Sequence, residues 1–495
     1  MTDQNEIRQA SKNDVVKGAF FAVIRFLLTS ALGIPTTIAL VRLLEPAQFG
    51  YWVVATAITG LLTSLAGSGL GSATSKLISQ EKASGNKEGE ARIARTAHKA
   101  AWLVAIFASF IVIVVGFFIF YFAKSGSQVV ILFAVLAPYV IFNPFYHIAI
   151  GTLVANAKPK KVEGSYVVGS VAFLIGIGIA LAFSREAVWI ALARSISTLL
   201  SYLFVIEGLK FDKRVSPLKM KEFVSNSFSA LVNSLGFSTI NRLDVLVLGT
   251  AVSVTDSGLY GPLSSLATVA QNVAALPASY YLPSAVKSIV ENDRKAVLDL
   301  YTTVTRAGIL LAGPVMVVLI AIPNQVLSLA FGARYAHLTL PARILAIGIA
   351  CQIISGPNGT LLFAFNKLRL FAIRSVVTFF ISVAACVVLV PIFKLPGAAF
   401  ATAVPLIVSN LISSIALYAS EKIYPNLIKT GLLLFALLAS VAIVAVVAAH
   451  SASKPFVVTC GFALGFAIPL GVYLATLTES ESQFISRYAS RLKTK

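Results

Sequence analysis

The apolar residues of this chain fall into blocks of about twenty, far longer than one face of an amphipathic helix requires. A helix of about twenty apolar residues is what a hydrocarbon core roughly 30 Å thick demands. About fourteen such blocks follow one another along the 495 residues, 57% of which are hydrophobic and only 12% charged. A β-barrel would instead show segments of about ten residues with alternating hydrophobicity. The sequence therefore predicts an all-α polytopic membrane protein with about 14 transmembrane helices.

The net charge of +20 is spread unevenly over the predicted loops. Most of the 40 lysines and arginines fall in the two tails and in alternate loops, such as KEGEARIARTAHK, KPKK and KFDKR. By the positive-inside rule these loops and both termini are cytoplasmic. The basic loops then face anionic lipid headgroups, and no nucleic-acid partner is expected. The connections on the other side are short and leave no room for an external domain.

An internal repeat divides the chain. A shift of 208 residues aligns GTLV at residues 151–154 with GTLL at 359–362, and Gly50 in QFGYW with Gly258 in DSGLYG. One shared offset indicates a duplicated lobe of six helices. Because six is even, the copies are related by a pseudo-two-fold axis along the membrane normal, with a substrate cavity between them. The predicted division is residues 1–215 for the N-lobe, 216–423 for the C-lobe, and 424–495 for two C-terminal helices and a cytoplasmic tail.

Helix breakers inside the predicted spans are candidates for moving parts. Gly33 and Pro35 both lie in the first span. Proline removes a backbone hydrogen bond and kinks a helix, which suits a gate. Glycine and proline are also common in membrane helices, so a structural role stays open.

Nothing in the sequence suits catalysis. The four histidines are scattered, and the three cysteines lie inside spans, where small packing residues are expected. There is no nucleophile, base and acid set, no metal-ligand cluster and no glycine-rich phosphate cradle. The sequence predicts a protein that is not an enzyme and holds no metal or cofactor.

Two short motifs resemble a known family. Residues 42–51, RLLEPAQFGY, resemble the R-x-L-x-P-x-x-[YF]-G-x-[YW] signature of polysaccharide flippases. Leu243-Asp244-Val245, followed by Gly258-Leu259-Tyr260, resembles the second-lobe pattern of the same proteins. These flippases belong to the multidrug, oligosaccharidyl-lipid and polysaccharide exporter superfamily (MOP), and the resemblance extends over the whole chain.

The resemblance implies a function and partners. The chain would translocate undecaprenyl-diphosphate-linked oligosaccharide, an O-antigen or related surface repeat unit, from the inner to the outer leaflet of the bacterial inner membrane. It would work by alternating access, driven by a proton or sodium gradient, beside membrane lipids, a polysaccharide polymerase and a chain-length regulator. The alternatives are a multidrug or peptidoglycan-precursor exporter of the same superfamily and, ranked last, a polysaccharide polymerase or ligase. Such an enzyme would carry one long outer loop, which this chain lacks.

Charges at bilayer depth cost a few kcal/mol, so each is a candidate for function. Arg25 lies deep in the first span, where it either grips the substrate diphosphate with its planar fork or pairs with a neighbouring helix. Arg306 either contacts substrate or extends to the inner surface. Arg242 is a third candidate for substrate contact, whereas a structural pair is expected for Arg194.

Asp244 is the only carboxylate well inside a predicted span. Residues two apart on a helix are turned by about 200°, so Arg242 and Asp244 are not expected to pair with each other. Asp244 is either a proton carrier in the cavity or a charged latch that pairs with an arginine of another helix. Tyr146 is expected to stack on a sugar ring, with anchoring at the membrane interface as the alternative. His147 beside it either relays protons or is simply packed.

Overall fold

The computed structural model describes residues 28–29, 32–63, 69–122, 128–156, 158–209, 223, 242–451 and 453–477. Within these residues every regular element is a helix, and 9 helices are long and apolar enough to cross a membrane. This confirms the predicted all-α class. Half of the first predicted span, residues 18–41, and most of the seventh, residues 225–250, lie outside the described residues, so the total of fourteen stays a prediction. The chain divides into two units, residues 1–261 and 262–495.

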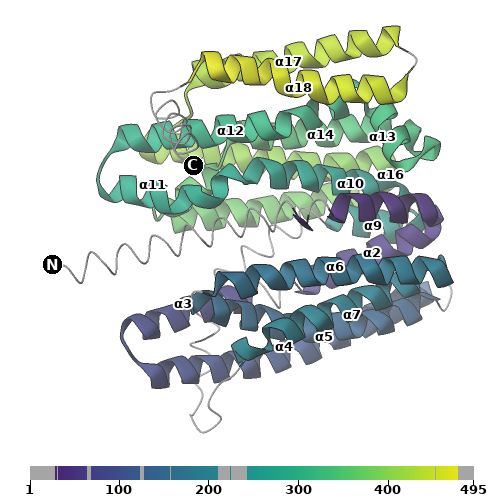
Figure 1. The fold of residues 1–495 in the computed structure, drawn as a ribbon, viewed down its shortest axis with the longest axis vertical. Helices are drawn as coiled ribbons and strands as arrows, with labels where there is room; N and C mark the ends of the chain where they lie inside the picture. Colours follow the sequence, from purple (N-terminus) through teal and green to yellow (C-terminus); the bar gives the residue numbers. More distant parts are fainter. Residues whose placement is uncertain are drawn as a thin grey trace, which may run out of the picture. The chain divides into compact units, whose positions relative to one another are not determined.

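The first unit is a set of helices around a central one, shown in purple to teal in Figure 1. Its elements are α2 (Pro46–Thr63), α3 (Gly69–Ala83), α4 (Lys87–Phe122), α5 (Gln128–Ala155), α6 (Pro159–Phe183), α7 (Ala187–Val205), the 3-10 turn η2 (Ile206–Leu209), α9 (Leu243–Ala251) and the start of α10 (Val254–Ala275).

Helix α5 holds the first unit together because it packs against α2, α3, α4, α6 and α7. Its sequence is apolar all round, as expected of a helix surrounded by others. Phe145 and Ile148 of α5 enter a core built mainly from alanines of α4, with Leu70, Ala73 and Ile78 of α3. Small side chains let membrane helices approach closely, which is how packing replaces the hydrophobic effect in lipid.

The second unit is centred on α12. Its elements are the rest of α10, η3 (Pro277–Tyr280), α11 (Tyr281–Val290), α12 (Arg294–Ala321), α13 (Pro323–Phe331), η4 (Ala333–Leu338), α14 (Thr339–Ser355), α15 (Asn358–Ala364), α16 (Leu368–Glu421), α17 (Leu427–His450) and α18 (Lys454–Ala475). The long α16 is broken at Lys394, whose φ of 52° and ψ of −121° are not helical.

Helix α12 packs against α14, α17 and α18, and α14 packs against α16. The last two helices, α17 and α18, therefore sit on α12, inside the second unit. Asn426 begins α17 with a side-chain cap, accepting a hydrogen bond from the Lys429 amide at 3.0 Å.

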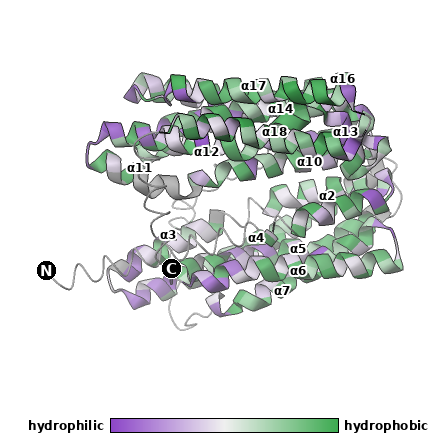
Figure 2. Cartoon of the chain, turned by 45° about the horizontal axis from the view of Figure 1, so that its top comes forward, coloured by the Kyte–Doolittle hydropathy of each residue, from purple (hydrophilic) through white to green (hydrophobic). Residues whose placement is uncertain are grey.

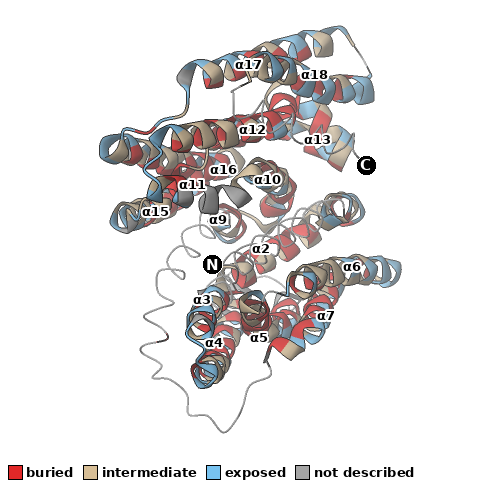
Figure 3. Ribbon diagram, turned by 60° about the vertical axis from the view of Figure 1, so that its left-hand side comes forward, coloured by how far each residue is buried: buried red, intermediate tan, exposed pale blue. Residues whose placement is uncertain are grey.

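Long helices in both units expose large apolar side chains. On α4, Trp102, Ile106, Phe110, Ile113 and Phe117 recur at helical spacing and are each more than half exposed. Figure 3 shows the same pattern, with buried residues where helices meet and exposed ones on the outward faces of α4, α6 and α17. In Figure 2, hydrophilic residues gather toward one end of α4 and of α12. Exposed apolar middles and polar ends are the pattern of helices in a bilayer; the protein is a multi-pass membrane protein.

Candidate functional site

Asp244 is buried in the first turn of α9, with 1% of its surface exposed. Its Oδ1 accepts a hydrogen bond from the Val245 amide at 2.7 Å. A carboxylate at a helix N-terminus is favoured by the helix dipole as well as by hydrogen bonds. Ser257 of α10 donates to the carbonyl of Val245 at 2.9 Å, so this turn is tied to α10. The structure thus places the one acid singled out from the sequence at a fixed, buried helix start.

Arg242 does not lie on that helix, which corrects the geometric argument made from the sequence. It occupies the N-cap position, with φ of −138° and ψ of −20°, and its side chain is exposed. The 200° turn between residues two apart applies only inside a helix. Arg242 and Asp244 nevertheless lie in different surroundings, because one is exposed and the other buried.

Both signature motifs meet in the first unit at a crossing of α2 and α10. A Cβ atom on Gly50 would overlap the backbone carbonyl of Val254, and one on Gly258 would overlap the carbonyl of Pro46. Gln48 of the same motif accepts a hydrogen bond from the Ala187 amide, at the start of α7, at 3.0 Å. The glycines of the signature therefore allow close backbone contact, and its glutamine connects α2 to α7.

Arg194 is the centre of an aromatic cluster at mid-span. Its guanidinium carbon lies 5.1 Å from the ring centre of Tyr139 and 5.4 Å from that of Phe173. Phe173 in turn stacks on Trp52 of α2, with ring centres 5.9 Å apart. The Tyr139 hydroxyl lies 3.3 Å from Oγ1 of Thr63. Aromatic faces attract a guanidinium through the ring quadrupole, so these rings are the structural partners that the sequence did not reveal.

The charge of Arg242 also acts on this cluster, more weakly than that of Arg194. The charges of Arg194 and Arg242 both act electrostatically on the Tyr139 hydroxyl. The members come from α2, α5, α6, α7 and the residue before α9, so no single-helix periodicity groups them. The cluster combines two planar cations, which bind phosphate oxygens along their edges, with aromatic faces. We call Trp52, Tyr139, Phe173, Arg194 and Arg242 the arginine-aromatic cluster.

Arg306 is fully buried on α12, with 0% of its surface exposed. Its guanidinium donates to the carbonyls of Thr476 at 3.1 Å and Tyr473 at 3.2 Å, and to Oγ1 of Thr476 at 2.6 Å. It also lies over the ring of Tyr473, 4.7 Å from its centre. Arg306 thus satisfies carbonyls at the end of α18, a position that favours a cation. Its contact with substrate stays a prediction.

Tyr146 also contacts neighbouring helices. It is 7% exposed, and its hydroxyl lies 3.0 Å from Oγ of Ser165 on α6. The ring packs edge-on against Tyr166 and His147. Stacking of Tyr146 on a sugar would require its contacts with α6 to open. Its predicted role in binding a sugar stays a prediction.

The remaining candidates lie near the start of the chain. Arg25 is outside the described residues. Gly33 and Pro35 are exposed in a short apolar helix, Leu32–Leu43. The hydroxyls of Thr36 and Thr37 donate to the carbonyls of Leu32 and Gly33. Such back-bonding by threonine often accompanies bent helices, and the gating role of Gly33 and Pro35 stays a prediction. Among the described residues no group of three or more potential metal ligands occurs.

Several solved transporters share this fold. An inward-facing multidrug resistance MATE family transporter of the MOP superfamily superposes with a TM-score of 0.65 at 14% identity, covering 81% of this chain and 99% of that chain. The lipid II flippase MurJ, in an inward closed conformation, superposes with a TM-score of 0.66 at 14% identity, covering 92% of this chain and 97% of that chain. A MOP superfamily transporter from Pyrococcus furiosus gives 0.51 at 15% identity, covering 80% and 94%. The fold is that of MOP-superfamily transporters and flippases.

The sequence identifies the family within that class. Residues 39–340 match the family described as polysaccharide biosynthesis protein. The match covers more than half of the chain, so the chain belongs to this family. A comparison with curated protein sequences gave no match. The family and the fold together confirm the resemblance to polysaccharide flippases of the superfamily.

Proposed function

We infer that the protein is a flippase that moves undecaprenyl-diphosphate-linked oligosaccharide from the inner to the outer leaflet of the bacterial inner membrane. The family and the transporter fold support the class. The main observation in favour of this substrate is the arginine-aromatic cluster, in which the Arg194 guanidinium lies over two aromatic rings at mid-span and the charge of Arg242 also acts on one of them.

The chemistry of the cluster matches both ends of such a headgroup. Charges inside a membrane face a cavity or a partner, because they are costly in lipid. The rings of Tyr139 and Phe173 lie close to the Arg194 guanidinium, and phosphate oxygens bind a guanidinium through its N–H edge. Aromatic rings also provide the apolar platforms on which sugar rings pack. A diphosphate joined to a saccharide would use both features at once.

The expected transport cycle is alternating access between the two leaflets, with both termini in the cytoplasm. Asp244 then has one of two roles in coupling to a proton or sodium gradient: it carries a proton, or it is a latch that stays charged. Its burial at the start of α9 supports a role in a helix contact and is compatible with both. A polysaccharide polymerase and a chain-length regulator would act on the translocated units.

Deletion of the gene tests the proposal. We expect lipid-linked repeat units to accumulate on the cytoplasmic face and surface polysaccharide to be lost, with both restored by the wild-type gene. Accessibility of the saccharide to a lectin in inside-out vesicles distinguishes the two leaflets. Loss of surface polysaccharide with repeat units on the outer leaflet would contradict the proposal and indicate a polymerase.

A second candidate is an exporter of the peptidoglycan precursor, because the fold is shared with the lipid II flippase over 92% of this chain. In that case the lipid that accumulates after depletion carries a peptide and is needed for growth. A multidrug exporter, the third reading, would instead show changed drug susceptibility with unchanged surface polysaccharide. The composition of the accumulated lipid therefore separates the candidates.

A further inference from the structure

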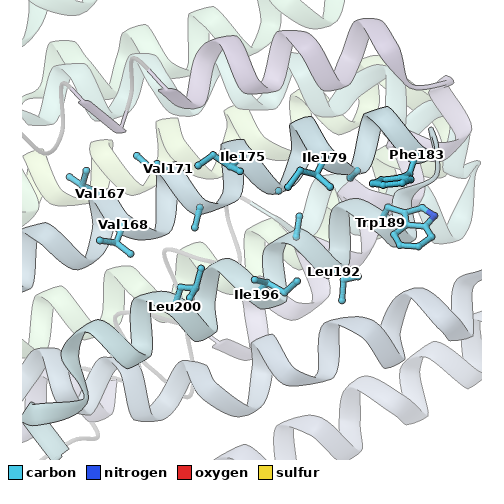
Figure 4. Close-up of a pocket in the computed structure, with 14 residues that line it drawn as sticks. Val167, Val168, Val171, Ile175, Ile179, Phe183, Trp189, Leu192, Ile196 and Leu200 are labelled. Carbon is cyan, nitrogen blue, oxygen red and sulfur yellow. The ribbon is translucent and has the colours of Figure 1, made fainter.

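A long apolar groove runs between α6 and α7 in the first unit (Figure 4). Its volume is about 620 Å³, within the range of small-molecule sites. Small residues, Ala172, Gly176, Ala180 and Ala193, form its floor, and they are less exposed than its walls. A Cβ on Gly176 would crowd Ala193, so the helix backbones nearly touch along the floor.

The walls of the groove are large apolar side chains that stand above this floor. Ile175 and Ile179 of α6 are 58% and 55% exposed, and Ile196 of α7 is 49% exposed. Phe183 and Trp189 close one end. Tryptophan is enriched where a membrane span meets the interface, so this end lies at a membrane surface.

The length of the groove selects its occupant. The lining residues of α6 run from Val167 to Phe183, which is roughly 24 Å at 1.5 Å per residue. One leaflet of a hydrocarbon core of about 30 Å is only about 15 Å deep. A phospholipid acyl chain from either leaflet would therefore fill only part of the groove. A chain that crosses the midplane, such as a long polyisoprenoid, matches its length.

Charge at the opposite end matches an anionic headgroup. Seven residues, or two helical turns, back along α6 from Val167 and Val168 lie Lys160 and Lys161, on the same face. Seven residues beyond Leu200, in η2, lies Glu207, which accepts hydrogen bonds from Lys158 and Lys161. Three lysines, at 158, 160 and 161, and two glutamates, Glu163 and Glu207, give this end a formal charge of +1, with Lys158 and Lys161 sharing Glu207 in ion pairs. The N-terminus of α6 adds the partial positive charge of its dipole.

We propose that the groove between α6 and α7 binds the polyisoprenoid chain of a polyprenyl phosphate, with the phosphate at Lys160 and Lys161. This proposal rests on the proposed function, because it concerns the tail of the same lipid carrier. It assigns that tail to a site apart from the arginine-aromatic cluster. The tail stays in an apolar groove open to lipid, and the charged headgroup lies at the basic end.

Photolabelling tests the assignment. The purified protein is placed in nanodiscs of phosphatidylcholine with a trace of diazirine-bearing undecaprenyl phosphate, irradiated and mapped by mass spectrometry. Adducts are expected on groove residues of α6 and α7. The Ile175→Trp and Ile196→Trp double variant, which fills the groove, should lower these adducts roughly tenfold, equivalent to about 1.4 kcal/mol of binding free energy. Ile113→Trp on the lipid-facing side of α4, where Ile113 is 55% exposed, is the matched control and should change nothing.

Competition identifies the chain. Unlabelled undecaprenyl phosphate should displace the probe, whereas farnesyl phosphate and phosphatidylglycerol should not. The inference is overturned by equal labelling of α4, by displacement with phosphatidylglycerol or farnesyl phosphate to the same extent, or by cross-links from Ile175→Cys to a second copy. If groove residues are labelled as expected but gene deletion leaves the lipid-linked saccharide unchanged, the proposed function is wrong and the inference about the groove is supported. If deletion traps saccharide inside but labelling falls elsewhere, only the groove inference fails.

Discussion

Gly258 lies so close to Pro46 that a Cβ atom on the glycine would overlap the Pro46 carbonyl oxygen. Gly50 makes the reciprocal approach to the backbone of Val254. These glycines are the pair that the 208-residue repeat aligns. The two glycines that the predicted repeat aligns therefore lie at one crossing, where α2 meets the start of α10, as expected if the repeats share a pseudo-two-fold axis.

Substitution of either glycine should push α2 and α10 apart at this crossing. Gly258→Ala inserts a methyl group against backbone, which cannot move as a side chain can, and should cost about 1 to 3 kcal/mol of folding free energy. The measurement is the thermal unfolding midpoint in detergent, with saccharide export in cells beside it. Gly60→Ala, on α2 with nothing within 4 Å of its Cβ position, is the control and should leave both unchanged. Equal effects of the two substitutions would show that α2 and α10 do not approach each other unusually closely at this crossing.

Arg306 should be needed for stable attachment of α18. Arg306→Met removes the donor to the carbonyls of Tyr473 and Thr476 and leaves them without their charged partner, which we expect to cost about 1.5 to 3 kcal/mol. Unfolding temperature and proteolysis near residue 476 would report the loss. Arg343→Met, at an arginine that donates one hydrogen bond to the carbonyl of Ile320, serves as the comparison and should cost less. Normal stability with lost export would instead favour the substrate contact predicted from the sequence.

Asp244→Asn should lower saccharide export, because both roles considered for this carboxylate need its charge or its proton. If Asp244 carries the proton, the remaining export should no longer depend on the pH outside. If it is a latch, the pH response should match that of the wild type while the rate falls. Export rates in cells or vesicles across a pH series measure both quantities. Asp256→Asn, in the first turn of α10, is the control acid. Unchanged rate and unchanged pH response would exclude both roles.

The fold class followed from the sequence because apolar length is a property of each helix by itself. The repeat likewise found Gly50 and Gly258, since a shared offset needs no knowledge of packing. The surroundings of Arg194 could not be predicted, because its partners Tyr139 and Phe173 lie on two other helices. A structural pair was predicted for Arg194 without a partner, and in the structure the faces of these two aromatic rings lie beside its guanidinium. Arg242 was assigned to a helix because the apolar run continues through it, whereas α9 begins one residue later.

Arg194 provides the sharpest test of the arginine-aromatic cluster. Arg194→Met keeps the length and apolar packing of the side chain but removes its positive charge and its hydrogen-bond donors. We expect it to weaken binding of the lipid-linked saccharide by about 1.5 to 3 kcal/mol, which is roughly tenfold to hundredfold. Arg194→Lys keeps the charge without the planar fork, so its affinity for the substrate should lie between those of the wild type and Arg194→Met. Binding to purified protein and export in cells are the two measurements.

The control for Arg194 is Arg185→Met, at an exposed arginine between α6 and α7. It removes the same charge outside the cluster and should leave binding unchanged. A cation held between Tyr139 and Phe173 also contributes to packing, so the unfolding midpoint of each variant must be measured beside its binding. Weaker binding at an unchanged midpoint places Arg194 in contact with the substrate. A lowered midpoint with unchanged affinity would limit Arg194 to holding α5, α6 and α7 together.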